Sequence, residues 1–218
     1  MSRALDVLLD LLFPPRCVFC QTLMEDGEGP VCGHCIRALP YTYGSGAEQT
    51  CPEISLAVSP LRYEGEVRES IRRYKFHGRK WYASAYGPLV AQCVEEHLSG
   101  RFDLISWVPL SEKRRRERGY DQAFLLARAV GHELGMDPVS TLRKAHNNPA
   151  QSGLTGAEDR RANVQGVYEC AHPEAVAGQR VLLLDDVLTT GSTLSECARI
   201  LRGAGAADVV CATLARAH

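Results

Sequence analysis

Apolar and polar positions along the chain predict strands and helices in turn. The unbroken apolar run at 181–184 is typical of a strand buried on both faces, as in a parallel sheet. Apolar side chains at helical spacing follow it as far as Gly203 and predict a helix directly after this strand. This order indicates an α/β fold with a mostly parallel sheet flanked by helices. Further strands are predicted at 54–58, 102–110, 139–142, 164–168 and 208–214, and further helices at 66–74, 82–97 and 123–134.

Three polar segments interrupt this pattern. Residues 41–50 are small and polar and are predicted to form a linker. Residues 111–122 are rich in arginine and are predicted to form a basic loop between a buried strand and a helix. Residues 144–163 form a long polar segment, and a loop of that length in a compact domain is usually functional or mobile. The linker divides the chain into a small N-terminal module, 1–50, and a larger domain, 51–218.

The first residues could be mistaken for a secretory signal peptide. Asp6 and Asp10 interrupt their apolar run, however, and no small-residue cleavage site follows. We therefore expect an amphipathic helix over 3–13 that docks on the body, because Leu5, Leu8, Leu9 and Leu12 lie at helical spacing. No apolar run approaches the roughly 20 residues that span a bilayer, so no integral membrane segment is expected.

Two CxxC pairs lie close together in the N-terminal module, and they consist of Cys17, Cys20, Cys32 and Cys35. Four thiolates at one centre are the usual tetrahedral zinc site, and such a site leaves no open position, so a structural zinc ion is expected. A redox CxxC motif and disulfides are the alternatives. His34 is an alternate ligand, although a surface histidine is the favoured interpretation. Cys51 stands apart and is interpreted as structural.

The charge balance and the cysteine content exclude some functions. The 25 basic and 26 acidic residues nearly cancel, which excludes a protein that coats nucleic acid by net charge alone but not a local basic patch. Nine cysteines without an export signal indicate a reducing compartment, so a cytoplasmic location is expected. In such a compartment clustered cysteines bind metal more often than they form disulfides.

Candidate chemistry lies at the end of the buried strand. Asp185 and Asp186 come at its carboxyl end, and a turn of hydroxyl residues around Gly191 leads into the next helix. Such a turn directs backbone N–H groups and a helix N-terminus to one point, which is an anion site, and glycine lets the backbone approach closely. The acids would repel the same anion, so sugar hydroxyls or a metal-bound sugar suit them better. A buried strand, a turn and a capped helix without a ligand are the alternative.

This run resembles the loop that binds PRPP (5-phosphoribosyl 1-pyrophosphate) in the type I phosphoribosyltransferases. The resemblance implies that Asp185 and Asp186 hold the ribose hydroxyls as the catalytic acids. It also implies Mg²⁺ with PRPP, because Mg²⁺ bridges phosphate and hydroxyl oxygens without a protein cage. The candidate pyrophosphate ligands are Arg114, Arg116 and Arg118, with Lys113 and Arg115 as alternates. The PRPP-binding run comprises Asp185, Asp186, Val187, Leu188, Thr189, Thr190, Gly191, Ser192 and Thr193.

Four further segments resemble the ComF family of bacterial DNA uptake and utilisation proteins, and the resemblance covers nearly the whole chain. These are the cysteine pairs, the Tyr-Lys-Phe-His-Gly-Arg run at 74–79, the segment 108–123 and the segment 151–164. The resemblance implies a role in transformation or DNA utilisation. The chain departs from the family at Asp121, where asparagine is usual, and after the first module, where a second cysteine pair is often present.

The acceptor of the ribose and the question of turnover stay open. The alternative to a phosphoribosyltransferase is a zinc-containing protein that binds PRPP, a nucleotide or single-stranded DNA without catalysis, as a partner of the DNA-uptake helicase. Aromatic and basic residues alternate over 74–82, a pattern that suits base stacking and phosphate contacts. A helix end packed on the core is the competing interpretation of that stretch.

Overall fold

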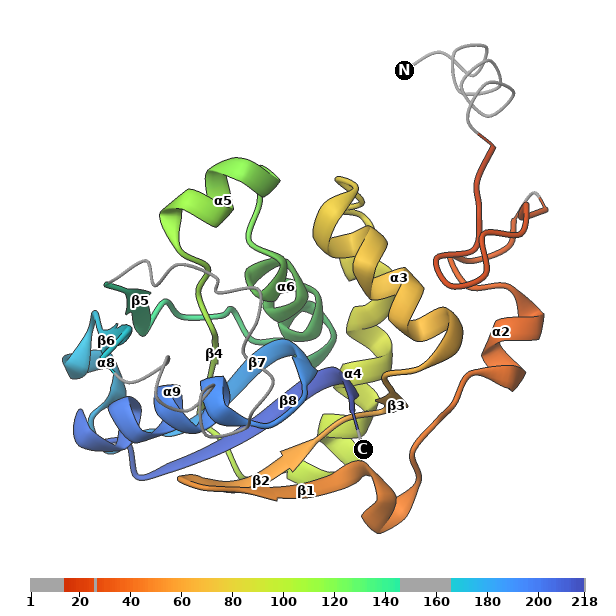
Figure 1. Cartoon of the computed structure of the whole chain (residues 1–218). Helices are drawn as coiled ribbons and strands as arrows, with labels where there is room; N and C mark the ends of the chain where they lie inside the picture. Colours follow the sequence, from red (N-terminus) through yellow and green to blue (C-terminus); the bar gives the residue numbers. More distant parts are fainter. Residues whose placement is uncertain (1–13, 26, 146–165, 218) are drawn as a thin grey trace.

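A computed structural model of the chain describes residues 14–25, 27–145 and 166–217 and is built on a six-stranded sheet (Figure 1). The strands lie in the order β1-β2-β8-β7-β4, and the short β3 also pairs with β8. Every pair is parallel except β1 with β2. The bounds are β1 Glu48–Cys51, β2 Ile54–Val58, β3 Leu61–Arg62, β4 Leu104–Trp107, β7 Arg180–Leu188 and β8 Asp208–Arg216.

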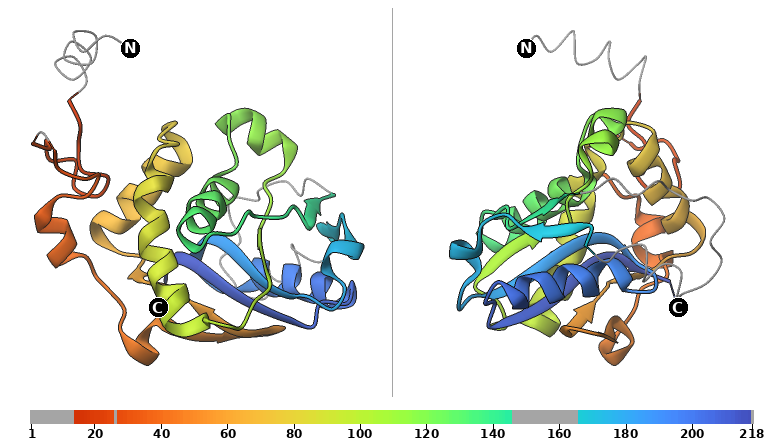
Figure 2. Two further views of the ribbon diagram at one scale, coloured as in Figure 1. Left: turned by 180° about the vertical axis from the view of Figure 1, so that it is seen from behind. Right: turned by 60° about the vertical axis from the view of Figure 1, so that its left-hand side comes forward.

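Helices cover both faces of this sheet (Figure 2). Leu182 and Leu184 of β7 belong to one hydrophobic core, and Val181 and Leu183 belong to a second core on the opposite face of the strand. Side chains of a strand alternate between faces, so a run that is apolar at every position is the consequence of burying both faces. One face carries α3 (Gly65–Phe76), α4 (Tyr82–Leu98) and α6 (Gln122–Leu134), and the other carries α9 (Ser192–Gly203).

A second, two-stranded sheet lies beside α9. It pairs β5 (Leu142–Lys144) with β6 (Tyr168–Cys170) in antiparallel fashion, and the short α8 (Pro173–Val176) follows. The predicted strands at 139–142 and 164–168 are therefore displaced. Thr141 is buried, and its hydroxyl is hydrogen-bonded to the Ser106 hydroxyl at 2.6 Å. The chain is therefore held against β4 at Thr141, and β5 begins only after it. The predicted helix at 3–13 and most of the predicted loop at 144–163 lie outside the described residues.

The arginine-rich segment after β4 is a helix, α5 (Glu112–Arg118), and the prediction of a basic loop was wrong. The Ser111 hydroxyl caps its start by accepting a hydrogen bond from the Arg114 N–H at 3.3 Å, and Gly119, with φ +74°, ends it. An Arg116–Glu112 ion pair at 2.9 Å spans one turn. Caps and ion pairs form this helix without an apolar face, which is why hydrophobic spacing gave no signal.

The N-terminal module shares its core with α3 and α4. Val18 and Phe19 are fully buried, and the Phe19 ring lies 5.8 Å from that of Tyr86. Arg73 of α3 donates to the Phe19 carbonyl at 2.5 Å. The module also contains α2 (Gly33–Ala38). The expected linker at 41–50 is irregular only in part, because its last residues form β1 and pair with β2.

None of the helices within the described residues is long and apolar enough to cross a membrane.

Candidate functional site

A cavity of about 300 Å³ opens at the carboxyl ends of β4 and β7. Open α/β sheets bind ligands at this edge. Its walls come from the end of α3, from α5, from the start of α6, from the paired strands β5 and β6 and from the β7–α9 loop. The polar side chains that line it are Tyr63, Lys75, Arg114, Arg118, Gln122, Lys144, Tyr168, Asp185, Asp186, Thr189 and Thr193.

The two predicted acids lie at the floor of this cavity. The Asp186 side chain is 5% exposed, and its Oδ1 lies 2.6 Å from the Lys75 Nζ. Its Oδ2 is buried and has no hydrogen-bond partner in the described part of the chain. The Asp185 Oδ1 accepts a hydrogen bond from the Asp186 N–H at 2.8 Å. Burial and the neighbouring Asp186 carboxylate raise the pKa of Asp185. Two adjacent carboxylates with a spare buried oxygen suit hydroxyl groups or a hard cation such as Mg²⁺.

The hydroxyl-rich turn lies beside the acids and leads into α9. Gly191 has φ +72° and forms the N-cap of the helix, and the Thr190 and Ser192 hydroxyls lie 2.9 Å apart. A Cβ at Gly191 would lie 2.9 Å from the Cys51 Sγ, so only glycine fits both the backbone angle and the space. Cys51, the last residue of β1, therefore supports this turn from behind. The first N–H groups of α9 have no carbonyl partner inside the helix, which makes the turn a candidate phosphate cradle.

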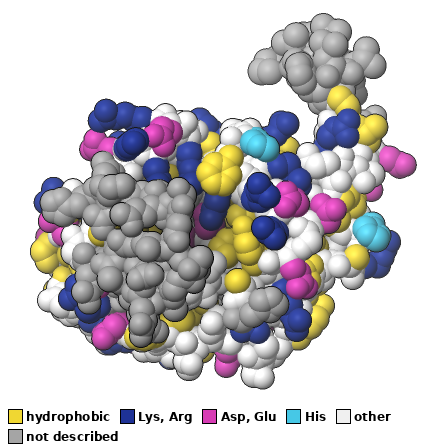
Figure 3. Space-filling view, viewed as in Figure 1, with side chains coloured by type: hydrophobic (Ala, Val, Ile, Leu, Met, Phe, Trp, Pro, Cys, Tyr) yellow, Lys and Arg dark blue, Asp and Glu magenta, His cyan; other side chains and the backbone are white. Residues whose placement is uncertain are grey.

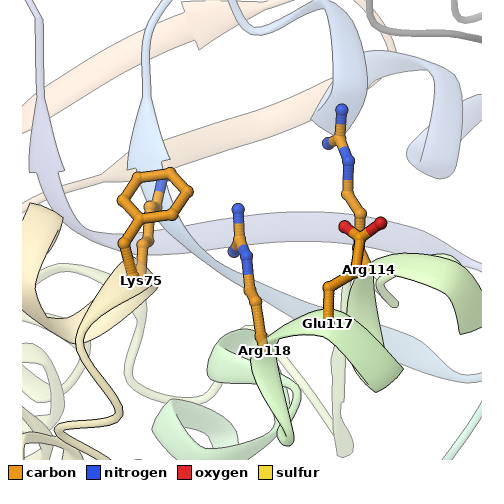
Figure 4. A pocket seen from close by; sticks show the side chains of 5 residues that line it. Lys75, Arg114, Glu117 and Arg118 are labelled. Atoms are coloured by element: carbon orange, nitrogen blue, oxygen red, sulfur yellow. The ribbon is translucent and has the colours of Figure 1, made fainter.

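Two of the three candidate arginines line the cavity, namely Arg114 and Arg118. Figure 4 shows both side chains extending from α5 beside Lys75, which extends from α3. All three residues line the cavity. The Arg118 Nη1 is buried without a partner among the described residues, and its guanidinium lies 4.8 Å from the centre of the Phe76 ring. Burial lowers the pKa of Arg118, although Asp186 opposes this shift. Arg116 is not brought into the cavity, because its exposed side chain pairs with Glu112.

The alternates on α5 also lie away from this cavity. Lys113 is exposed, with its Nζ 4.0 Å from Glu117, and Arg115 lines a different cavity behind β4 and β5. Lys and Arg side chains are concentrated over α5 and the end of α3 on the face that Figure 3 shows. The helix therefore presents its basic residues to two sides.

Five polar residues of the cavity, among them Tyr63 and Tyr168, were not assigned from the sequence. Lys75 was considered only for DNA, although its motif was recognised. Gln122 is almost fully buried, and its Oε1 has no partner within the described ranges. The Lys144 Nζ lies 3.3 Å from the Tyr168 hydroxyl, and burial together with Arg114 lowers the pKa of Lys144. These residues come from separate elements, so no local spacing connects them.

Asp121, which departs from the usual family motif, has a structural role. Its carboxylate accepts hydrogen bonds from the Leu110 N–H at 2.9 Å and from the Phe124 N–H at 3.2 Å. It thus caps α6 and holds the end of the β4 segment. Asp121 does not line the main cavity, and its charge is directed at backbone donors rather than at a phosphate.

The four cysteines of the two CxxC pairs converge on one point. Their Sγ atoms all lie within 4.8 Å of one another, and those of Cys20 and Cys32 are 3.6 Å apart. Tetrahedral zinc with bonds of about 2.3 Å places sulfur atoms about 3.8 Å apart, so the cluster fits zinc. The N–H groups of Cys32 and Cys35 donate to sulfur at 3.4 Å, which stabilises thiolates. Among the described residues no other His, Cys, Asp and Glu side chains form such a group.

The aromatic and basic stretch 74–82 divides into a buried and an exposed part. Tyr74 and Tyr82 are buried in the core, as the competing interpretation of this stretch expects. Phe76 is 64% exposed and Trp81 45% exposed. The exposed part, which also contains His77, Arg79 and Lys80, is available to a ligand.

Two family models match the chain. The phosphoribosyl transferase domain matches residues 121–218, and the double zinc ribbon domain matches residues 8–68. The first range contains the acids and the turn before α9, and the second contains the cysteine cluster. Both matches agree with the expected fold class, a phosphoribosyltransferase-like sheet with a small N-terminal zinc-binding module.

Curated relatives match over most of the chain. Competence protein F of Haemophilus influenzae is 29% identical over 93% of this chain and 97% of its own length. DNA utilization protein YhgH of Salmonella typhimurium is 29% identical over 94% of this chain and 100% of its own length. Competence protein ComFC of Bacillus subtilis is 30% identical over 72% of this chain and 63% of its own length. The chain is a homologue of these ComF and YhgH proteins, with a zinc ribbon followed by a phosphoribosyl transferase domain.

Proposed function

We propose that the cavity at the ends of β4 and β7 binds PRPP with Mg²⁺, and that the chain serves DNA uptake or utilisation through this ligand in the cytoplasm. The observation that carries the proposal is the pair of acids directly beside an open helix N-terminus, with Asp186 Oδ2 and Arg118 Nη1 both buried and unpartnered within the described residues. Buried polar groups normally have partners, so these atoms are arranged for a ligand with hydroxyl and phosphate groups.

Each part of the ligand has a complementary wall. The N–H groups and hydroxyls of the turn at 189–193 receive the 5′-phosphate. Asp185 and Asp186 receive the ribose hydroxyls, which donate to carboxylate oxygens. Arg114 and Arg118 receive the pyrophosphate from the opposite side.

This arrangement supports phosphoribosyl transfer. A nucleophile attacks C1 of the ribose, the bond from C1 to the pyrophosphate oxygen breaks, and pyrophosphate leaves with the electron pair. Arg118, in its half-buried position, would stabilise the charge that grows on the leaving group. Mg²⁺, held at Asp185 and Asp186, would neutralise charge on the departing pyrophosphate. Pyrophosphate release in the presence of bases or amines tests turnover separately from binding.

We predict that Arg118→Ala weakens PRPP binding about tenfold or more while it leaves ribose 5-phosphate binding unchanged. A charge-assisted contact of this kind is worth about 1.5–3 kcal/mol, and ribose 5-phosphate has no pyrophosphate to lose. Titration calorimetry with both ligands measures the difference. Arg116→Ala is the matched control, because Arg116 lies on the same helix but pairs with Glu112 in solvent. Equal losses for both ligands would show that α5 does not hold the pyrophosphate.

A second candidate function is the binding of single-stranded DNA, as a partner of a DNA-uptake helicase. Exposed Phe76 and Trp81 favour it, because they flank the cationic residues Arg79 and Lys80. Bases stack on aromatic side chains without sequence preference, and lysine and arginine hold the phosphates. This surface adjoins the cavity, since Phe76 contacts Arg118.

We predict weak, strongly salt-dependent binding of a short single-stranded oligonucleotide, measured by fluorescence anisotropy. Trp81→Ala combined with Arg79→Ala should reduce the affinity about tenfold, since one stacked base and one phosphate contact are lost. Tyr43→Ala is the control, because Tyr43 is 77% exposed but lies outside this stretch. An absence of binding at low salt would remove this function.

A further inference from the structure

Lys75 occupies an unusual place between the acids and the arginines. It lies at the end of α3, its side chain is 22% exposed, and its Nζ lies 2.6 Å from the Asp186 Oδ1. At this distance the two side chains form an ion pair, and the carboxylate that Lys75 contacts is almost fully buried. The Lys75 ammonium therefore neutralises the Asp186 carboxylate.

The ion pair satisfies only part of the site. The Asp186 Oδ2, the Arg118 Nη1 and the Gln122 Oε1 are all buried, and none has a hydrogen-bond partner within the described residues. All three side chains line the same cavity as Lys75. A structural ion pair would be expected to carry supporting hydrogen bonds on its remaining oxygen. Among the described residues nothing supplies this support to the Lys75–Asp186 pair, so its geometry suits an interaction that is exchanged.

Buried hydrogen bonds hold the backbone beneath Lys75 in place. The Tyr74 hydroxyl donates to the Gln122 carbonyl at 2.7 Å, and the Tyr120 hydroxyl donates to the Tyr74 carbonyl. These buried bonds hold the end of α3 to the start of α6. The four-carbon stem of lysine can still rotate from this fixed point.

Space for such a rotation exists next to the main cavity. A second cavity, of about 450 Å³, is lined by Lys75, Phe76, Arg114, Glu117 and Arg118. Lys75, Arg114 and Arg118 line both cavities, and Figure 4 shows their side chains extending toward one shared region. A lysine released from Asp186 thus has space to turn toward Arg114 and Arg118.

We infer that Lys75 is a resident counter-ion which a divalent cation displaces from Asp186, and which then joins Arg118 on the pyrophosphate. This inference rests on the proposed binding of PRPP with Mg²⁺. It assigns Lys75 two successive partners of the same charge sign, a carboxylate before binding and a phosphate after it. Lysine suits this exchange because its ammonium is a compact charge on a flexible stem.

The inference predicts opposite effects on two ligands. Without Lys75, a divalent cation no longer competes with an ammonium for Asp186, so a cation alone should bind about tenfold or more tightly. PRPP should bind about tenfold or more weakly, because its pyrophosphate loses one charged contact. A lysine that only stabilised the fold would not move the two affinities in opposite directions.

The test uses the full-length, zinc-loaded chain with Lys75→Met. Mn²⁺ binding without PRPP is followed by electron paramagnetic resonance, and PRPP binding with Mg²⁺ by calorimetry. Arg72→Met is the matched control, because Arg72 lies on the same helix but pairs with Glu69 in solvent. Lys75→Gln repeats the experiment with a polar side chain, and thermal melts confirm that each variant is folded.

Tighter Mn²⁺ binding in both Lys75 variants, abolished by adding Asp186→Asn, is the expected result. Unchanged or weaker Mn²⁺ binding in the folded variants would overturn the inference, and so would a gain that survives Asp186→Asn. Tighter PRPP binding in Lys75→Met would show that Lys75 does not join Arg118 on the pyrophosphate. If neither wild type nor variant binds PRPP but the Mn²⁺ gain is present, the proposed function fails while the resident counter-ion is supported.

Discussion

Cys32→Ser is expected to release zinc from the chain and to lower its melting temperature by about 20 °C or more. Structural zinc contributes about 10–16 kcal/mol of binding free energy in small zinc-dependent folds, and each ~1 kcal/mol lost from a chain of this size lowers the melting temperature by about 2–4 °C. The effect should reach beyond the module, because Val18 and Phe19, beside the cluster, are buried against α3 and α4. Elemental analysis and calorimetric melting measure the two changes.

Cys170→Ser is the matched control, since Cys170 is a partly buried cysteine on β6, outside the cluster. It should keep one zinc ion per chain and melt close to the wild type. Ribose 5-phosphate binding should survive Cys32→Ser at temperatures where the chain is folded, because the turn before α9 belongs to the other face of the sheet. Well under one zinc ion per chain in the wild type, or equal melting of the two variants, would contradict a structural zinc site.

The strands and helices that the sequence predicted best are those with a one- or two-sided apolar pattern. In β7 every position from Val181 to Leu184 is buried, because alternate side chains enter the two cores. Burial on both faces produces the unbroken apolar run from which the strand was predicted. α5 has no buried residue, so hydrophobic spacing could not reveal it. Its signals were the cap Ser111 and the terminating Gly119, which local capping rules would have recognised.

The site was predictable only where it is local in sequence. Asp185, Asp186 and the turn around Gly191 follow one another, so their order was sufficient to group them. The pairing of Lys75 with Asp186 depends instead on how far α3 extends over the tip of β7, which the buried Tyr74 and Tyr120 hydroxyls set. Likewise, Arg114 and Arg118 lie on the face of α5 that lines the cavity, while Arg116 lies on another face. A segment predicted as a loop has no helical faces, so the prediction could not distinguish these arginines.

Thr190→Asp is expected to abolish binding of both PRPP and ribose 5-phosphate, with a loss of about 100-fold or more. The new carboxylate would lie at the N-terminus of α9, where Thr190 now contacts Ser192. A like charge placed against the 5′-phosphate costs several kcal/mol, and about 3 kcal/mol is already a factor of roughly 100. Thr190→Asn is the control, because it has nearly the same shape as aspartate without the charge. Calorimetry with both ligands measures the loss.

Substituting the two acids should affect ligand binding differently from substituting Thr190 in the turn. Asp185→Asn combined with Asp186→Asn should weaken PRPP and ribose 5-phosphate binding about tenfold or more, since the ribose hydroxyls lose charged acceptors. Inorganic phosphate should bind as before, because it needs only the turn and the helix N-terminus. A variant of the acids that lost phosphate as well would mean that the two halves act as one, and Thr190→Asp with undiminished affinity for both sugar phosphates would place the 5′-phosphate elsewhere.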